Sequence, residues 1–210
     1  MQLSFDPSKQ YRNIFPTPLG MFQLPDSENL SPRICDVILA RMEKEQGIDR
    51  SNRGGWHSDD QLLNWPELQF ADLGDTFRSA VSHMIATTSG TQKFNVALTL
   101  GAWANVNGPG NFNGNHIHPG NHWSGCLYVK APDFRNDPVN LAGHIEFMDP
   151  RGAVSMIRMP GMSDTFSLPP QTGAILVFPS WLYHCVNTFS IDTTRISIAF
   201  NARIDRFEPA

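Results

Sequence analysis

The second half of the chain alternates apolar and polar residues with the period of two that is typical of β-strands. The clearest case is KFNVALTLGAWANV, where Phe94, Val96, Leu98 and Leu100 alternate with small or polar residues. Shorter apolar stretches follow at residues 123–130, 143–149, 173–179, 181–186 and 194–202, separated by Gly, Pro and Asn. Many short strands in succession predict a closed antiparallel barrel or jelly roll.

The first half shows the 3.6-residue period of amphipathic helices. One helix is expected from Ser31 as N-cap and Pro32 at the first helical position to a stop at Gly47. A second is expected within residues 70–90; its inward residues are Leu73, Phe77, Val81 and Met84, and Gly90 ends it. Helices followed by strands predict an α+β, mainly β fold. We expect one domain, 1–210, in which a helical part (1–92) packs on one face of a β core (93–204).

The two faces of the predicted strands differ in character. In RISIAFN, Arg195, Ser197 and Asn201 share one face, whereas Ile196, Ile198 and Phe200 share the other. In the strand before residue 107, Thr99, Trp103 and Asn105 oppose Leu98 and Leu100. One face therefore suits packing against helices, and the other suits the polar and aromatic lining of a ligand-filled barrel.

Composition narrows the possible functions. The chain has 210 residues, 40% of them apolar, a net charge of −4 and no run of basic residues, which disfavours nucleic-acid binding. No apolar run approaches the ~18 residues of a membrane span, and the N-terminus lacks the apolar core of a signal peptide. Three widely spaced cysteines without a CxxC motif fit a reducing, cytoplasmic setting.

The stretch HIHPGNHWSGCLYV places three histidines within seven residues. His116 and His118, at i and i+2 of a strand, point the same way and can grip one metal ion. His184, on a later strand, is the best third ligand. Such a site leaves one side of the metal open for a co-substrate and oxygen. His122 follows a turn-forming PGN and is either a ligand or a supporting group.

Arg195 lies eleven residues beyond His184, where the next strand can carry it into the same interior. A buried guanidinium is costly without a partner. Asp192 is one candidate partner. The alternative is an anionic ligand: guanidinium binds carboxylate in bidentate fashion, and Ser197 can add a hydroxyl bond to the same group.

Residues 116–129, 143–151, 173–186 and 195–201 resemble the 2-oxoglutarate and Fe(II)-dependent oxygenase superfamily, most of all a bacterial and phage branch related to prolyl hydroxylases. The resemblance implies a double-stranded β-helix with His116 and His184 as iron ligands. It also implies that Arg195 and Ser197, with Tyr128, hold the far carboxylate of 2-oxoglutarate, and Asn105 the other end. Trp123, His122 and Trp103 are candidates for contact with the substrate.

His118 is a departure from that superfamily, whose usual motif has a carboxylate at this position. An imidazole there raises the net charge of the centre by one unit. Three-histidine iron centres also occur in thiol dioxygenases, but those enzymes need no pair like Arg195 and Ser197. Glu146 or Asp149 could instead complete the triad, although neither has the expected spacing.

The function expected from these residues is that of a non-haem iron dioxygenase. It would couple decarboxylation of 2-oxoglutarate to hydroxylation, by O2, of a small molecule or peptide. The alternative is a metal-binding cupin-like barrel that works without 2-oxoglutarate, as a three-histidine dioxygenase, an isomerase or a non-catalytic binder. Helices flanking the barrel would be available as the contact surface of a homodimer.

Overall fold

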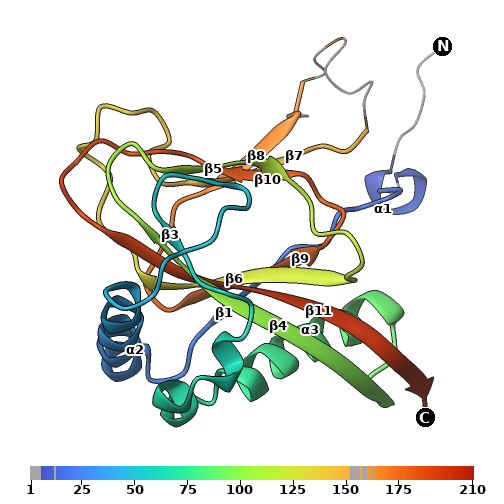
Figure 1. Ribbon diagram of the computed structural model, residues 1–210. Helices are drawn as coiled ribbons and strands as arrows, with labels where there is room; N and C mark the ends of the chain where they lie inside the picture. The colour runs from blue at the N-terminus through green and yellow to red at the C-terminus, as the bar shows by residue number, and fades with distance from the viewer. Residues whose placement is uncertain (1–5, 12, 152–156, 158–159, 162) are drawn as a thin grey trace.

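The computed structural model of the protein describes residues 6–11, 13–151, 157, 160–161 and 163–210, which form two antiparallel sheets lying one above the other (Figure 1). The six-stranded sheet has the order β1 (Gly20–Gln23), β9 (Ala174–Pro179), β6 (Trp123–Lys130), β11 (Arg195–Pro209), β4 (Phe94–Asn107) and β3 (Trp56–His57). The five-stranded sheet has the order β2 (Asn52–Arg53), β5 (Phe112–His116), β10 (His184–Val186), β7 (Ile145–Met148) and β8 (Thr165–Leu168).

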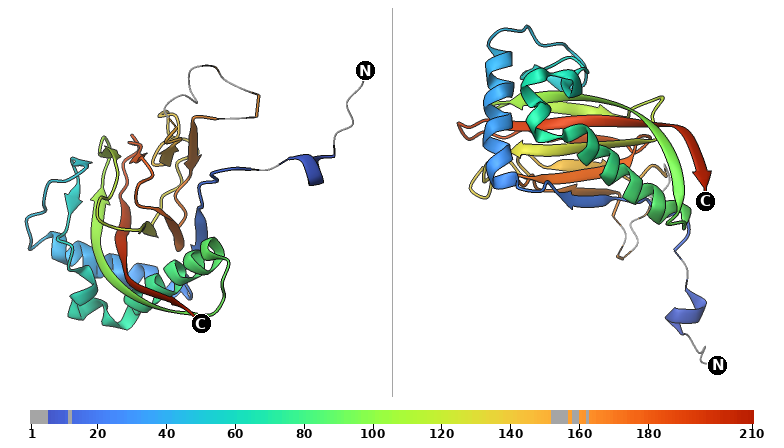
Figure 2. Two further views of the ribbon diagram at one scale, coloured as in Figure 1. Left: turned by 90° about the vertical axis from the view of Figure 1, so that its right-hand side faces the viewer. Right: turned by 90° about the horizontal axis from the view of Figure 1, so that it is seen from below.

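Two long helices lie against the six-stranded sheet, on the side away from the five-stranded one (Figures 1 and 2). Helix α2 (Ser27–Met42) contacts β6, and α3 (Leu73–Ser89) contacts β4, β1 and β9. The short helices are α1 (Pro7–Gln10), η1 (Leu62–Asn64) and η2 (Pro66–Ala71). Within the described residues, none of these helices has the length and apolar character needed to cross a membrane.

Helix α3 has the predicted inward face, but α2 begins earlier than its sequence indicates. Leu73, Phe77, Val81 and Met84 of α3 are buried, and Gly90 ends the helix with a φ of 72°. Helix α2 runs from Ser27 to Met42, so both the expected start at Ser31 and Pro32 and the expected stop at Gly47 are wrong. The first backbone hydrogen bonds are accepted by the carbonyl of Asp26, and Pro32 lies inside the helix, where it removes one such bond.

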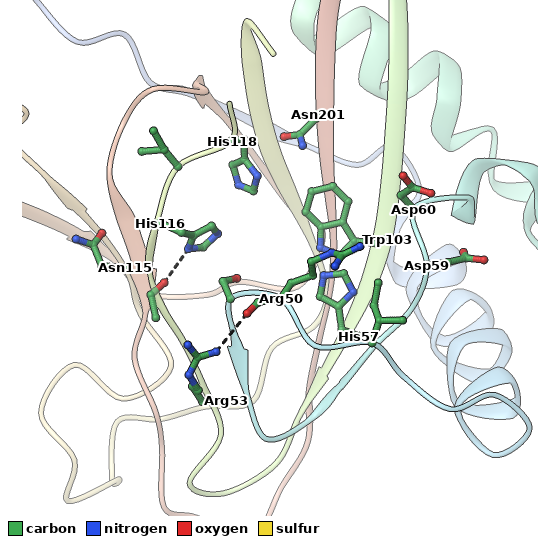
Figure 3. Close-up of a pocket in the computed structure, with 14 residues that line it drawn as sticks. Arg50, Arg53, His57, Asp59, Asp60, Trp103, Asn115, His116, His118 and Asn201 are labelled. Carbon is green, nitrogen blue, oxygen red and sulfur yellow. Dashed lines mark hydrogen bonds between the residues drawn. The ribbon is translucent and has the colours of Figure 1, made fainter. Parts of the chain in front are cut away.

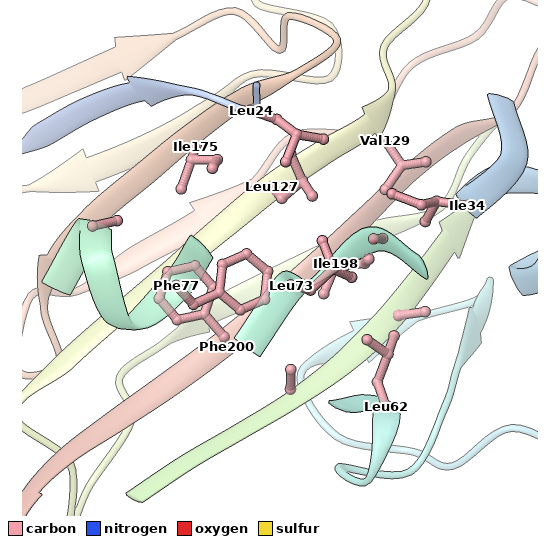
Figure 4. Close-up of a cluster of buried hydrophobic side chains, with 14 of the residues drawn as sticks. Leu24, Ile34, Leu62, Leu73, Phe77, Leu127, Val129, Ile175, Ile198 and Phe200 are labelled. Carbon is pink, nitrogen blue, oxygen red and sulfur yellow. The ribbon is translucent and has the colours of Figure 1, made fainter. Parts of the chain in front are cut away.

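The main hydrophobic core lies between the helices and the six-stranded sheet (Figure 4). The predicted alternation of β11 is confirmed here, because Ile196, Ile198 and Phe200 belong to this core. Phe200 stacks on Phe77 of α3, with ring centroids 4.1 Å apart. Since side chains of a strand alternate between faces, the same packing turns Arg195 and Ser197 toward the space between the sheets. The core thus fixes the orientation of the polar face.

The division at residue 92 is less simple than a helical part and a β part. Residues before 92 also supply β1 and β3, at the two edges of the six-stranded sheet, and β2, at one edge of the other. At the other end of the chain β11 continues to Pro209, paired with β4 along its length.

Candidate metal centre

Three histidines meet between the two sheets. A ring nitrogen from each of His116, His118 and His184 lies within 4.8 Å of the others, which makes this a group able to hold a metal ion. The Nε2 atoms of His118 and His184 are 3.3 Å apart. Ring centroids are separated by 4.3 Å for His116 and His184 and by 5.0 Å for His116 and His118. The structure therefore brings together the three residues expected as ligands.

Strand pairing and backbone carbonyls orient these rings. His116, at the end of β5, is paired directly with His184, the first residue of β10. The Nδ1 atoms of His116 and His184 lie 2.7 Å from the Gly114 carbonyl and 2.8 Å from the Leu182 carbonyl. A carbonyl can only accept, so each Nδ1 carries the proton and each Nε2 keeps a free lone pair. This is the tautomer that a metal needs.

The charge state of the histidines also suits a metal. Burial lowers the pKa of His118 to about 3 and that of His184 to about 4, and it lowers the pKa of His116 as well. All three imidazoles are therefore neutral at pH 7, and no proton must be displaced when a cation binds.

No carboxylate joins the three histidines among the described residues. Asp149 instead pairs with Arg151 at 2.5 Å. Glu146 does not belong to the group of possible ligands either. The carboxylate alternatives to His118 therefore have no support in the geometry, and the donor set is three neutral nitrogens.

A narrow cavity of about 50 Å³ continues from the histidines toward Arg195. Arg195 is 2% exposed and donates to the Gly143 carbonyl (3.0 Å) and to Asn107 Oδ1 (2.9 Å). Burial lowers the pKa of its guanidinium. It forms no ion pair with Asp192, or with any other carboxylate of the described residues. A buried positive charge of this kind calls for an anion.

Asn105, Ser197 and Tyr128 form a row across three neighbouring strands beside this cavity. Ser197 on β11 is paired with Asn105 on β4 and with Tyr128 on β6. Three buried polar atoms, Asn105 Oδ1, Tyr128 Oη and Arg195 Nε, make no hydrogen bond to any described residue. Burial raises the pKa of Tyr128 well above its usual value, so its hydroxyl remains a donor. Together with Ser197, these groups fit a bound carboxylate-bearing molecule.

The three candidate substrate contacts fall in different places. Trp103 lines both this cavity and a wider cleft in front of it. Trp123 packs in the main core, because it lies an odd number of residues from Tyr128 on β6 and so faces the helices. His122 is exposed, and its Nδ1 accepts the Ile204 N–H. The structure therefore brings Trp103, but neither Trp123 nor His122, to the metal centre.

Two further residues of the site, His57 and Asn107, were not identified from the sequence pattern. His57 is 6% exposed, stacks on Trp103 with 5.7 Å between ring centroids, and is paired with Asn105. Its position on a strand only two residues long gives no readable alternation. Asn107 orients Arg195 from the last residue of β4, and the odd-numbered pattern through Trp103 and Asn105 would have identified it.

Comparison with known proteins agrees with this geometry. A family model described as "Putative 2OG-Fe(II) oxygenase" matches residues 101–201, the span that holds the three histidines and Arg195. The matched span is just under half of the chain. No curated protein sequence matches this chain.

Several solved structures share the fold of this chain. A prolyl-4-hydroxylase from Pseudomonas putida superposes with a TM-score of 0.58 at 14% identity, covering 88% of this chain and 91% of that one. A prolyl hydroxylase from Trichoplax adhaerens gives a TM-score of 0.58 at 12% identity, covering 88% and 83%. HygX from Streptomyces hygroscopicus, solved with nickel and 2-oxoglutarate, gives 0.57 at 11% identity, covering 92% and 83%.

Proposed function

We propose that this protein is a non-haem dioxygenase that couples decarboxylation of 2-oxoglutarate to hydroxylation of a small molecule or peptide. His116, His118 and His184 would hold Fe(II) through their Nε2 atoms. The bound metal and 2-oxoglutarate together supply the activation of O2 and the oxidation of a C–H bond. The two sheets would then form the double-stranded β-helix of the superfamily.

The observation that carries this proposal is the uncompensated charge of Arg195. A guanidinium that is 2% exposed and has only neutral partners among the described residues is unfavourable by itself. The far carboxylate of 2-oxoglutarate would neutralise it and accept from Nε, which has no partner among those residues. Ser197 and Tyr128 would donate hydroxyl bonds to the same carboxylate. A three-histidine centre that works without 2-oxoglutarate would have no use for this charge.

Two phenylalanines cover one side of the three histidines. Phe178 lies edge-on to His184 at 4.7 Å between centroids, and Phe147 packs on both. Both phenylalanines are almost fully buried. A dry wall on this side strengthens the attraction between the histidines, the metal and the anion, because the local dielectric is low.

The test is a spectroscopic titration without oxygen. Adding 2-oxoglutarate to the Fe(II)-loaded protein should produce the visible charge-transfer absorption of a metal-bound 2-oxo acid, and admission of O2 should then release succinate. His184→Ala should abolish both signals. His83→Ala is the matched control, because His83 lies exposed on α3 and away from the site. Iron binding without any response to 2-oxoglutarate would refute the proposal and favour the cupin-like alternative.

A further inference from the structure

The segment from Arg50 to Ser58 has no role in the proposed binding of iron and 2-oxoglutarate. It links the two sheets: β2 pairs with β5 in one sheet, and β3 pairs with β4 in the other. The chain crosses between them at Gly54 and Gly55, whose φ angles are 69° and 70°. A Cβ at Gly55 would lie 2.6 Å from the Val106 carbonyl, so only glycine fits this close crossing.

This crossing segment forms one wall of an open cleft of about 780 Å³ (Figure 3). The same cleft is lined by His116 and His118, which would hold the metal, and by Trp103. A molecule lying in the cleft would therefore rest on the crossing segment while it reaches the metal centre. This is the position that a substrate must take if the proposed function is correct, so the inference below rests on that function.

The crossing segment brings two arginines to the cleft, Arg50 and Arg53. Neither forms an ion pair with a described residue. Nη1 of Arg53 donates to the carbonyls of Asn52 (2.9 Å) and Arg50 (3.2 Å), which hold the side chain on the same side of the cleft as His116 (Figure 3). Exposed arginines are ordinarily mobile in solvent, but Arg53 is tethered, and its remaining N–H groups are left for another partner.

Arg50 extends toward the stacked rings of His57 and Trp103 (Figure 3). Its proximity has an electrostatic effect: burial lowers the pKa of His57, and the charge of Arg50 lowers it further. His57 is therefore neutral, and its Nδ1, 2.6 Å from the Ser58 carbonyl, carries the proton. Among the residues that line the cleft, the only carboxylates are those of Asp59 and Asp60.

The cleft also contains two carboxylates, but they lie at its other side. Figure 3 shows Asp59 and Asp60 across β4 from Arg53 and His116. Asp59 accepts the backbone N–H of Gln61, and Asp60 accepts from the side-chain amide of that residue. They do not compensate the arginines. The side of the cleft that holds His116 therefore carries the guanidinium of Arg53 and neither of these carboxylates (Figure 3).

We propose that Arg50 and Arg53 form a subsite for an anionic group of the substrate, a carboxylate or a phosphate monoester. The planar guanidinium of Arg53 presents paired N–H groups that match either anion. The substrate of the proposed oxygenase is then an acid that lies over Trp103, with the carbon to be oxidised facing the histidines.

The test measures binding of simple aromatic anions by calorimetry, without added iron. The probes are phenyl phosphate, benzoate and uncharged benzyl alcohol. The two anions should bind more tightly than the alcohol. Arg50→Gln and Arg53→Gln should each weaken anion binding about fivefold, because an exposed charged pair contributes modestly. Arg78→Gln is the matched control, since Arg78 is exposed on α3 and donates Nη1 to the Leu98 carbonyl at 2.9 Å; it should change nothing.

A second titration at saturating 2-oxoglutarate separates this subsite from the buried Arg195. Anion binding that persists at saturating 2-oxoglutarate supports the proposal. The probe whose affinity falls more in the Arg50→Gln and Arg53→Gln variants, phenyl phosphate or benzoate, identifies the preferred anion. Equal binding of all three probes, displacement by 2-oxoglutarate, or unchanged binding in a double Arg50→Gln and Arg53→Gln variant would overturn it. Because the first titration needs neither iron nor 2-oxoglutarate, its outcome is independent of whether the protein proves to be an oxygenase.

Discussion

Substitution of Arg195 separates the two roles of its side chain, charge and shape. Arg195→Gln removes the charge, and Arg195→Lys keeps it but removes the planar fork. A hydrogen bond to a charged group contributes about 1.5–3 kcal/mol, so loss of the guanidinium–carboxylate pair should weaken binding of 2-oxoglutarate about 100-fold. Lysine retains a single charged bond, and we expect a loss of about tenfold. Anaerobic titration of the Fe(II)-loaded variants gives both dissociation constants.

Thermal unfolding provides an independent measurement on the same proteins. At a 2-oxoglutarate concentration 100 times the wild-type dissociation constant, binding stabilises the native state by about 2.7 kcal/mol. For a chain of this length that raises Tm by roughly 5–10 °C. The same concentration should move the Tm of Arg195→Gln by only about 1 °C. Arg203→Gln, on an exposed ion pair of β11, should behave like the wild type. If Arg195→Gln keeps an affinity within threefold of the wild type, Arg195 does not bind the co-substrate.

Three further predictions concern the histidines and the core. Loss of a residue that only supports a metal ligand lowers metal affinity ~10–100-fold. His118→Ala removes a ligand and should lower metal affinity by more than this, whereas His118→Asp should retain metal binding. Competition with a chelator measures the metal affinity of each variant. The pKa of His118 is about 3 and that of His184 about 4 in the fold, so the unfolded chain takes up more protons below pH 6.5. The metal-free protein should therefore lose about 1 kcal/mol of unfolding free energy per pH unit for each histidine as pH falls from 6 to 4, and His118→Ala should show a shallower slope in urea. Phe200→Ala should cost about 3–5 kcal/mol by the same method, and Phe207→Ala, which removes a partly exposed ring that contacts Phe94, should cost less, about 1 kcal/mol.

The alternation of side chains along a strand predicted most of the site. It placed Arg195 and Ser197 opposite Ile196 and Ile198, and the burial of the latter pair in the main core confirms the faces. The signal was clear because β11 is long and paired on both sides. One face of such a strand packs in the hydrophobic core and the other lines the ligand site. Apolar and polar residues therefore alternate along its sequence, and the alternation shows which face each residue occupies.

The sequence predicted side-chain positions less well on short strands and beyond the ends of strands. His118 lies two residues beyond the end of β5, so its position depends on its N–H bond to the Ser180 carbonyl rather than on strand geometry. Trp123 is close to the histidines along the chain, but the phase of β6 turns its side chain to the opposite face. Strands β2 and β3 have two residues each and no period of their own. Such elements are fixed by long-range pairing, which a single sequence does not display.

The presence of His118 in place of a carboxylate connects the metal centre to the arginines of the cleft. In a centre with two histidines and a carboxylate, the charges of Fe(II), that carboxylate, Arg195 and the 2-oxoglutarate dianion would cancel. With three neutral histidines one positive charge would remain, and it would be only partly screened, because Phe147 and Phe178 cover one side of the site. Arg50 and Arg53 add two more on the open side. The proposed anionic substrate would neutralise this excess, so substrate binding should become weaker when His118→Asp restores the carboxylate. Measuring benzoate affinity in the iron-loaded His118→Asp variant at saturating 2-oxoglutarate tests that link, and an affinity equal to that of the iron-loaded wild type would mean that the two sites act independently.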